Sequence, residues 1–419
     1  MAIELSNLTF TDQDDVVPQT GVERILNTGL TNTLAGNDII TGTGGRYSIF
    51  NSGTLNTADG NDIITGIHND PGEDTLFGYG IYNETGTIDT GDGNDIISGI
   101  SQQGRGVETL IGTGIENRRG TIDTGDGNDI ITGISEDIGI TSAYGIINTG
   151  DGNDTITGTA RGVGIVVGIA TIEKNIFLGS LDTGKGNDII TGTGGFGIQN
   201  SSSRFTTDDG DDIITGNSTG SGSGINNHGP MDTGDGNDII TGTNTESGFG
   251  IINSADITTG DGNDIITGIG RRGIYNVATI NTGDGDDSII VNGGVNGTGS
   301  EYGIYNNGGA IITGNGNDSI IANEGFESAE NSSGAWFLGE GEDYIKGFGS
   351  GDFYGGNGND TLELTPGTYT VGIWGEGGES PIFTKGNQLM ITSEFERLIA
   401  GGTIYDFASL TAGQIIIVS

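Results

Sequence analysis

The chain has 419 residues, of which 85 are glycine, 32% are hydrophobic and 6% are aromatic, so it lacks the apolar side chains to fill several globular cores. Its formal net charge of -43, from 57 acidic and 14 basic residues, argues against nucleic acid or anionic lipid as a partner. The absence of cysteine excludes disulfides and thiolate metal sites.

Residues 1–33 contain mixed apolar residues and are predicted to form an N-terminal cap that covers the first edge of a repeat structure. The acids Glu4, Asp12, Asp14 and Asp15 stand where a secretory signal would carry basic residues and an apolar run, so no cleavable signal is visible. No segment reaches the length of an apolar membrane span.

Residues 34–361 repeat one acidic turn, Gly-Asp-Gly-Asn-Asp, which leads directly into Ile-Ile-Thr-Gly. Successive turns are mostly 23 to 26 or 31 to 34 residues apart, so one turn is expected per coil of a solenoid. Ordered stacking is favoured over disorder because Ile and Val recur at fixed offsets from every turn. The last Asp of each turn gives the series Asp38, Asp62, Asp95, Asp129, Asp154, Asp188, Asp212, Asp238, Asp264, Asp287, Asp318, Asp343 and Asp360.

Each coil contains short β-branched runs separated by Gly and Asn, which predicts an all-β, right-handed parallel β-helix with two or three strands per coil. Besides the run after the turn, a Gly-Ile-X-Asn run recurs in mid coil. Its Asn residues are predicted either to stack as a ladder or to adopt a left-handed turn conformation. The predicted inward columns are Ile81, Ile115, Ile146, Ile251, Ile274 and Ile304, and Ile97, Ile131, Ile190, Ile240 and Ile266.

Stacked coils would bring the last Asp of each turn into one column, with neighbours roughly 5 Å apart. Such a column repels itself unless cations neutralise it, and hard carboxylate and carbonyl oxygens favour calcium. Acidic residues become denser near the end of the repeats, at Asp343, Asp352 and Asp360, which predicts a β-roll with two columns there. Asp352 is therefore added to the candidate metal ligands.

The segment Thr90–Ser98 (Thr-Gly-Asp-Gly-Asn-Asp-Ile-Ile-Ser) resembles the nonapeptide of RTX calcium-binding repeats, Gly-Gly-x-Gly-x-Asp-x-U-x, at every defined position but the first. The resemblance implies that ions lie between successive turns, held by the last Asp of each turn and by backbone carbonyls. Most RTX members carry two nonapeptides per coil, whereas this chain carries mainly one, which predicts a single column. Thirteen turns give an estimate of about ten to thirteen calcium ions.

Residues 362–419 lack the turns and are predicted to form a C-terminal cap. The cap resembles the uncleaved C-terminal signals of type I secretion, on the evidence of Phe395–Gly402 and the apolar tail Gln414–Ser419. Export and a calcium-rich destination together predict a secreted, extracellular protein, either free or associated with the cell surface. A folding cap without a signal role is the alternative.

The chain has two His residues and no His-Glu-x-x-His or Gly-x-Ser-x-Gly motif, so a non-catalytic structural or adhesive role at a bacterial surface or matrix is expected. The alternative is a carbohydrate-active β-helix lyase or epimerase. Period-two alternation predicts an outward strip for self-association or for a cell-surface polysaccharide, with ice binding as a third option. Its members are Ile63, Ile96, Ile130, Ile189, Ile239 and Ile265, with Thr65, Thr132, Thr191, Thr241 and Thr267.

Overall fold

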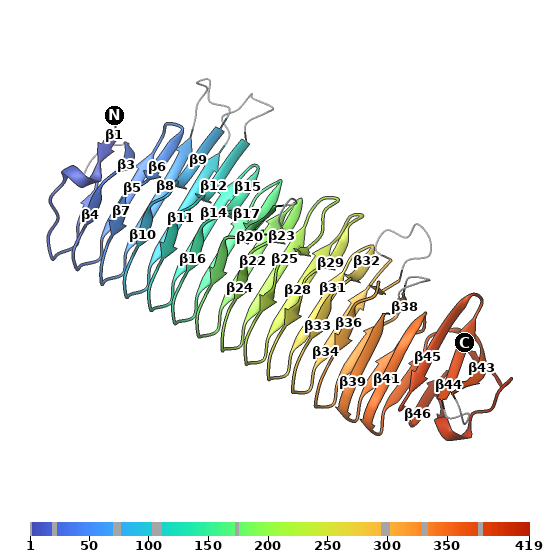
Figure 1. Ribbon diagram of the computed structural model, residues 1–419. Helices are drawn as coiled ribbons and strands as arrows, with labels where there is room; N and C mark the ends of the chain where they lie inside the picture. The colour runs from blue at the N-terminus through green and yellow to red at the C-terminus, as the bar shows by residue number, and fades with distance from the viewer. Residues whose placement is uncertain are drawn as a thin grey trace. The chain divides into compact units, whose positions relative to one another are not determined.

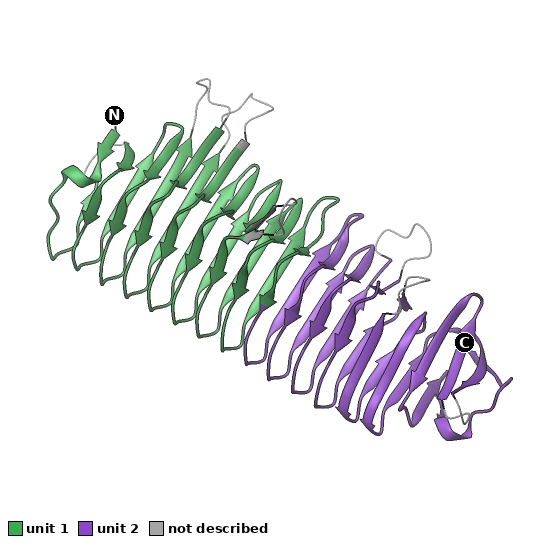
Figure 2. Ribbon diagram, viewed as in Figure 1, with its two compact units in different colours: residues 1–231 green, residues 232–419 purple. Residues whose placement is uncertain are grey.

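The computed structural model describes residues 2–18, 23–69, 77–102, 111–171, 176–294, 302–328, 334–375 and 380–419. The chain divides into two compact units, residues 1–231 and 232–419 (Figure 2). Both consist of short strands that coil repeatedly around an apolar interior (Figure 1). Each unit is described by itself below.

Unit 1 contains three parallel sheets, and one strand of each is contributed by most coils. Sheet A comprises β1 (Ala2–Glu4), β3 (Arg24–Asn27), β6 (Tyr47–Asn51), β9 (Phe77–Asn83), β12 (Ile111–Asn117), β15 (Ile138–Ser142), β18 (Val163–Val167), β23 (Phe196–Asn200) and β26 (Ile225–Asn227). Sheet B comprises β2 (Val16–Val17), β5 (Ile39–Thr43), β8 (Ile63–Asn69), β11 (Ile96–Gln102), β14 (Ile130–Ser135), β17 (Thr155–Thr159), β22 (Ile189–Gly194) and β25 (Ile213–Ser218). Sheet C comprises β4 (Leu30–Asn32), β7 (Thr54–Asn56), β10 (Thr87–Asp89), β13 (Thr121–Asp123), β16 (Ile146–Asn148), β21 (Ser180–Asp182) and β24 (Arg204–Thr206).

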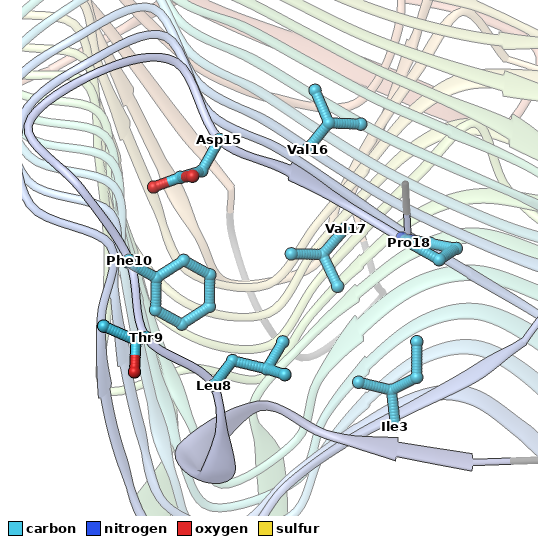
Figure 3. Close-up of a pocket in the computed structure, with 8 residues that line it drawn as sticks. All are labelled: Ile3, Leu8, Thr9, Phe10, Asp15, Val16, Val17 and Pro18. Atoms are coloured by element: carbon cyan, nitrogen blue, oxygen red, sulfur yellow. The ribbon is translucent and has the colours of Figure 1, made fainter. Parts of the chain in front are cut away.

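The start of the chain belongs to the first coil of unit 1. The strands β1, β2 and β4 pair in parallel with β3, β5 and β7, and the 3-10 helix η1 (Leu5–Asn7) buries Leu5 completely. A cavity of about 340 Å³ lies at this end (Figure 3). Its lining comprises Ile3, Leu8, Thr9, Phe10, Asp15, Val16, Val17 and Pro18. An antiparallel pair, β19 (Ile169–Thr171) and β20 (Ile176–Leu178), projects as an insertion.

The core of unit 1 is three stacked columns of large aliphatic side chains, one per sheet, because in-register parallel pairing places like residues above one another. Ile97 and Ile131 are neighbours in sheet B, and Ile81 and Ile115 in sheet A, all fully buried as predicted. The prediction for Ile146 is wrong: it lies in sheet C and is 46% exposed, and Ile140 takes the position above Ile115.

The Asn residues of the mid-coil run form the predicted ladder within the turn between sheets A and C. The Nδ2 of Asn51 donates to Oδ1 of Asn83 (2.9 Å), and Nδ2 of Asn83 donates to Oδ1 of Asn117 (2.9 Å). All three Asn side chains are completely buried, and none has a positive φ, so the left-handed alternative is wrong. Ser142 replaces Asn in the coil where Ile146 was misassigned, and it accepts from Asn117 Nδ2 at 3.3 Å.

Unit 2 continues the same architecture after β27 (Met231–Asp232), the strand at which the units divide. Sheet A comprises β29 (Phe249–Asn253), β32 (Arg272–Asn276), β35 (Ile304–Asn306) and β38 (Phe326–Glu327). Sheet B comprises β28 (Ile239–Asn244), β31 (Ile265–Ile269), β34 (Ser288–Asn292), β37 (Ser319–Ala322), β40 (Tyr344–Lys346), β42 (Thr361–Leu364), β46 (Arg397–Ala400) and β47 (Thr403–Asp406). Sheet C includes β30 (Ile257–Thr258), β33 (Thr279–Asn281), β36 (Ala310–Ile312), β39 (Ala335–Gly341) and β41 (Gly351–Gly358).

The last coils of unit 2 change in size and then end in an antiparallel cap. The coil from Asp343 to Asp360 contributes strands only to sheets B and C, which gives it two strands instead of three. The cap adds β43 (Gly367–Trp374), β44 (Ser380–Lys385), β45 (Gln388–Ser393) and β48 (Ile415–Val418), with the 3-10 helix η2 (Phe407–Ser409) before the last strand. The predicted all-β parallel solenoid is therefore confirmed, and its last strands pair antiparallel.

Candidate metal-binding turns

The acidic turn owes its shape to two backbone positions with positive φ. In the turn Thr90–Asp95, Gly91 has φ 77° and Gly93 has φ 154°. A Cβ on Gly93 would lie 1.5 Å from the Gly60 carbonyl oxygen of the preceding coil, so the coils stack too closely for any side chain there. The position of Gly91 is less strict, because Leu34, Ala58 and Asp208 occupy it in other turns with φ of 70°, 61° and 54°.

The last Asp of each turn in unit 1 points into the turn and is almost completely buried, with at most 1% exposure. Its Oδ1 accepts the backbone N–H of the last Asp one coil earlier. The distance is 2.7 Å from Asp62 N to Asp95 Oδ1, 2.7 Å from Asp95 N to Asp129 Oδ1, and 2.8 Å from Asp129 N to Asp154 Oδ1. The same bond links the remaining pairs Asp38 and Asp62, Asp154 and Asp188, and Asp188 and Asp212.

Unit 2 repeats this carboxylate ladder. The N–H of Asp238 donates to Oδ1 of Asp264 at 2.8 Å, and the N–H of Asp343 donates to Oδ1 of Asp360 at 2.9 Å. Between them the ladder passes through Asp264, Asp287, Asp318 and Asp343, each step at 2.8 Å. The structure thus brings the last Asp residues of each unit into one buried row.

The second carboxylate oxygen of most of these residues has no hydrogen-bond partner. In the part of the chain that the structure describes, the buried Oδ2 atoms without a partner include those of Asp38, Asp62, Asp95, Asp129, Asp154, Asp188, Asp287, Asp318, Asp343 and Asp360. In two turns a hydroxyl takes this role, because Thr233 and Thr259 donate to Oδ2 of Asp238 and Asp264. Elsewhere the equivalent hydroxyl donates to a carbonyl oxygen, as Thr90 does to Thr124 O at 3.3 Å, but it still lies close enough to the carboxyl five residues later to lower that group's pKa. A buried acceptor left unpaired is costly, and an ionised one more so.

Burial accordingly raises the pKa of these carboxyls. The pKa of Asp95 rises to about 7 because of desolvation, which the Thr90 hydroxyl and the Asp62 amide oppose and the neighbouring carboxylates of Asp129 and Asp62 reinforce. Desolvation also raises the pKa of Asp129 to about 6 and that of Asp343 to about 7. Neutral pH thus lies near or above the point at which these buried groups ionise.

The penultimate residue of the turn forms a second ladder that runs in the opposite direction. The side-chain oxygen of Asn61 accepts the N–H of Asn94 at 2.7 Å, and that of Asn94 accepts the N–H of Asn128 at 2.7 Å. The first acidic position is exposed: Asp126 Oδ1 accepts the N–H of Asp151 at 3.2 Å, and Lys185 forms an ion pair with Asp209 at 2.7 Å. The turn is therefore held by ladders on both sides of the buried carboxylates.

The sequence interpretation missed a residue at each end of the ladders. Asp15 N–H donates to Asp38 Oδ1 at 2.7 Å, and Asp14 Oδ1 accepts the N–H of Asn37 at 2.9 Å, so residues 11–15 form an additional turn. Two features of the sequence indicate this additional turn: Asp15 lies 23 residues before Asp38, and Val16 and Val17 follow it where Ile-Ile follows the other turns. At the far end, Glu396 Oε2 accepts the N–H of Asp360 at 2.8 Å.

Asp352 does not join the row. It lies on β41 in sheet C, in register with Ala335 and Ile391, where it is partly exposed. The second carboxylate column expected around Asp343–Asp360 is therefore not found among the described residues. The two-strand coil expected of a β-roll is present, but its other turn, residues 347–350, contains no acid.

The oxygen atoms that the buried rows of last Asp residues offer are suitable ligands for a hard cation. Most gaps between successive coils are flanked by two buried carboxylates whose Oδ2 atoms lack a hydrogen-bond partner, and the turns offer only oxygen ligands. Within the described residues no group of three His, Asp or Glu side chains converges on one point. A bound ion would therefore need backbone carbonyls as well as carboxylates, a combination that Ca²⁺ accepts and that Zn²⁺ rarely uses.

Comparison with known proteins finds no family whose model matches this chain and no curated protein similar to it. Among the residues described, no helix is long and apolar enough to span a membrane.

Proposed function

We propose that the chain is a calcium-binding solenoid whose folding depends on calcium. The observation that carries this proposal is the row of buried Oδ2 atoms without hydrogen-bond partners in each unit. Asp38, Asp62, Asp95, Asp129 and further last Asp residues would hold the ions together with turn carbonyls. Bound calcium supplies the positive charge that offsets carboxylate desolvation and repulsion.

Coupling of folding to calcium follows from the charges and from the glycines. A chain with a net charge of -43 and 85 glycines loses much conformational entropy on ordering and gains little from apolar burial. Without calcium, the cost of the buried carboxylates adds to that entropy, so we expect an expanded chain. This behaviour suits export as an unfolded chain through a type I system and folding outside, with residues 362–419 as the signal.

We propose a structural or adhesive role rather than a catalytic one, on the basis of the outer face of sheet B. The predicted register is confirmed in unit 1, where Ile130 and Ile189 are 41% and 40% exposed. The outward residues of β5, β8, β11, β14, β17, β22 and β25 from Ile39 to Asn217 are all Ile, Thr, Ser or Asn, except Gln102 at the end of β11. An uncharged strip with exposed Ile side chains on so acidic a chain favours lateral association or binding to a surface polysaccharide.

The experiment that tests the calcium proposal measures hydrodynamic radius and thermal stability in calcium and in excess chelator. We expect a compact, β-rich chain in calcium and an expanded, less stable one in chelator. A radius and an unfolding temperature that chelator leaves unchanged would refute the coupling. For the strip, Ile96, Ile130 and Ile239 replaced together by Lys should reduce self-association in calcium while the β-rich spectrum is kept; normal association of that variant would remove the strip from the proposal.

A further inference from the structure

A threonine stands five residues before the last Asp in every predicted acidic turn except the last two. The series begins with Thr33, which precedes Asp38, and ends with Thr313, which precedes Asp318. Each of these Thr side chains is completely buried, although Thr is usually an exposed residue. A hydroxyl withdrawn from water at the same place in successive turns is expected to have a hydrogen-bonding role there.

The Thr hydroxyl lies beside two acceptors and has one hydrogen to donate. In the turn of Asp264, Thr259 donates to the Oδ2 of Asp264 and lies 3.1 Å from the carbonyl oxygen of Thr282 in the next coil. Thr313 donates to the equivalent carbonyl oxygen, that of Leu338, at 2.9 Å. Rotation of the hydroxyl therefore decides whether the buried carboxylate or the carbonyl receives the hydrogen bond.

The last two turns have no such hydroxyl, because Leu338 and Gly355 take the place of Thr before Asp343 and Asp360. At Gly355 there is no room for a side chain, since a Cβ would lie 1.9 Å from the carbonyl oxygen of Glu394 and 2.9 Å from Oδ2 of Asp360. Two acceptors thus face the point at which the other turns place a donor. The Oδ2 atoms of Asp343 and Asp360 are both buried without a hydrogen-bond partner.

We propose that the Thr hydroxyl of each turn, here called the turn hydroxyl, sets how strongly that turn depends on calcium. Without an ion, the turn hydroxyl can donate to the buried carboxylate and offset part of its desolvation cost. With calcium bound, Oδ2 has the ion as its partner, and the turn hydroxyl can donate to the carbonyl of the next coil instead. The turns of Asp343 and Asp360 have no turn hydroxyl and therefore depend on calcium most. This inference rests on the calcium proposal and names the residue that grades it from turn to turn.

The first test is Thr90→Val, which replaces the turn hydroxyl beside Asp95 by a methyl group of similar size. Folding of the full chain is followed by far-UV circular dichroism, with sucrose titration in chelator and urea titration in calcium. We expect the folding equilibrium constant to fall about tenfold or more in chelator, because a hydrogen bond to a buried carboxylate is lost. In calcium it should fall less than about threefold, because the carboxylate keeps the ion as a partner.

The matched control is Thr31→Val. Thr31 is 2% exposed, and its hydroxyl donates to Oδ1 of Asn27 at 2.8 Å, in the Asn ladder instead of an acidic turn. The same substitution there removes a buried hydrogen bond that has no carboxylate in it. It should therefore lower the folding equilibrium constant by the same factor in chelator and in calcium.

The reverse test compares Leu338→Thr with Leu338→Val, two variants with side chains of nearly equal volume. Both lose part of a buried Leu, so the difference between them isolates a hydroxyl introduced beside Asp343. In chelator, Leu338→Thr should fold about tenfold more favourably than Leu338→Val, and in calcium the two should agree within about threefold. If Thr90→Val folds in neither condition, this pair decides the question.

Equal effects of Thr90→Val in chelator and in calcium would overturn the inference. A larger loss in calcium would also overturn it, because the turn hydroxyl would then position the carboxylate for the ion. So would a Leu338→Thr variant that folds no better than Leu338→Val in chelator. These outcomes leave the calcium proposal intact, since that proposal depends on the original chain. An original chain that folds equally well in chelator and in calcium would refute the calcium proposal and this inference together.

Discussion

Replacement of one buried turn carboxylate should have opposite effects on stability with and without calcium. In Asp129→Asn the side-chain oxygen can still accept the N–H of Asp95, but the charge at the Oδ2 position is lost. Burial raises the pKa of Asp129 from 3.8 to about 6, so at pH 7 the ionised form costs about 3 kcal/mol of folding free energy. The side-chain NH₂ group of the new Asn would lie buried at the Oδ2 position without an acceptor, which costs about 1–2 kcal/mol and offsets part of this gain. Without calcium, the variant should be more stable by about 1–2 kcal/mol.

With calcium, Asp129→Asn removes an anionic ligand from the gaps on both sides. A site held at a hundredfold excess over its dissociation constant contributes about 3 kcal/mol, so the loss should exceed the gain seen in chelator. The assay is far-UV circular dichroism, with urea unfolding in calcium and sucrose-induced folding in chelator, since osmolytes favour the folded state. The control Asp126→Asn lies at the exposed first position of the same turn and should be nearly neutral in both. If Asp129→Asn destabilises the chain equally in chelator, the reasoning from buried charge is refuted.

Two further predictions follow from the turns. In chelator, stability should fall as pH rises from about 4 to about 7, because a raised carboxyl pKa gives stability that is complete below the unfolded value of about 3.8 and is lost by the folded values of about 6 to 7. Calcium affinity should change in the opposite sense, and pH-independent folding in chelator would contradict this prediction. Gly127→Ala should cost about 3 kcal/mol, since φ is 154° and a Cβ would lie 1.5 Å from Gly93 O, whereas Gly44→Ala, with open space around it, should cost only about 1 kcal/mol in urea unfolding.

The spacing of the acidic turns made the stacking of coils predictable, because each turn is followed by the same inward Ile. The positions of Asp62, Asp95, Asp129 and Asp154 in one buried row follow directly from that register. The hydrogen-bonded ladder of Asn83 and Asn117 was one of the two alternatives that the sequence predicted for these residues.

The errors arose where one motif fits two strands or where coil size changes. Gly145–Asn148 matches the mid-coil pattern in sequence but forms the last strand of its coil, and Ser142 occupies the ladder position instead of Asn. Asp352 was placed by counting acids along the chain, whereas the coil there loses its sheet A strand and carries Asp352 onto sheet C. Asp15 was missed because Gln13 stands where the other turns have Gly.

The most direct test of the calcium account is the number of ions bound per folded chain. Equilibrium dialysis against calcium, followed by elemental analysis of the protein, should give about ten to thirteen calcium ions per chain that appear together with the β-rich spectrum. Magnesium at the same concentration should not replace them, because it tolerates the required coordination poorly. A folded, β-rich chain that retains no calcium, or only one or two ions, would contradict the account.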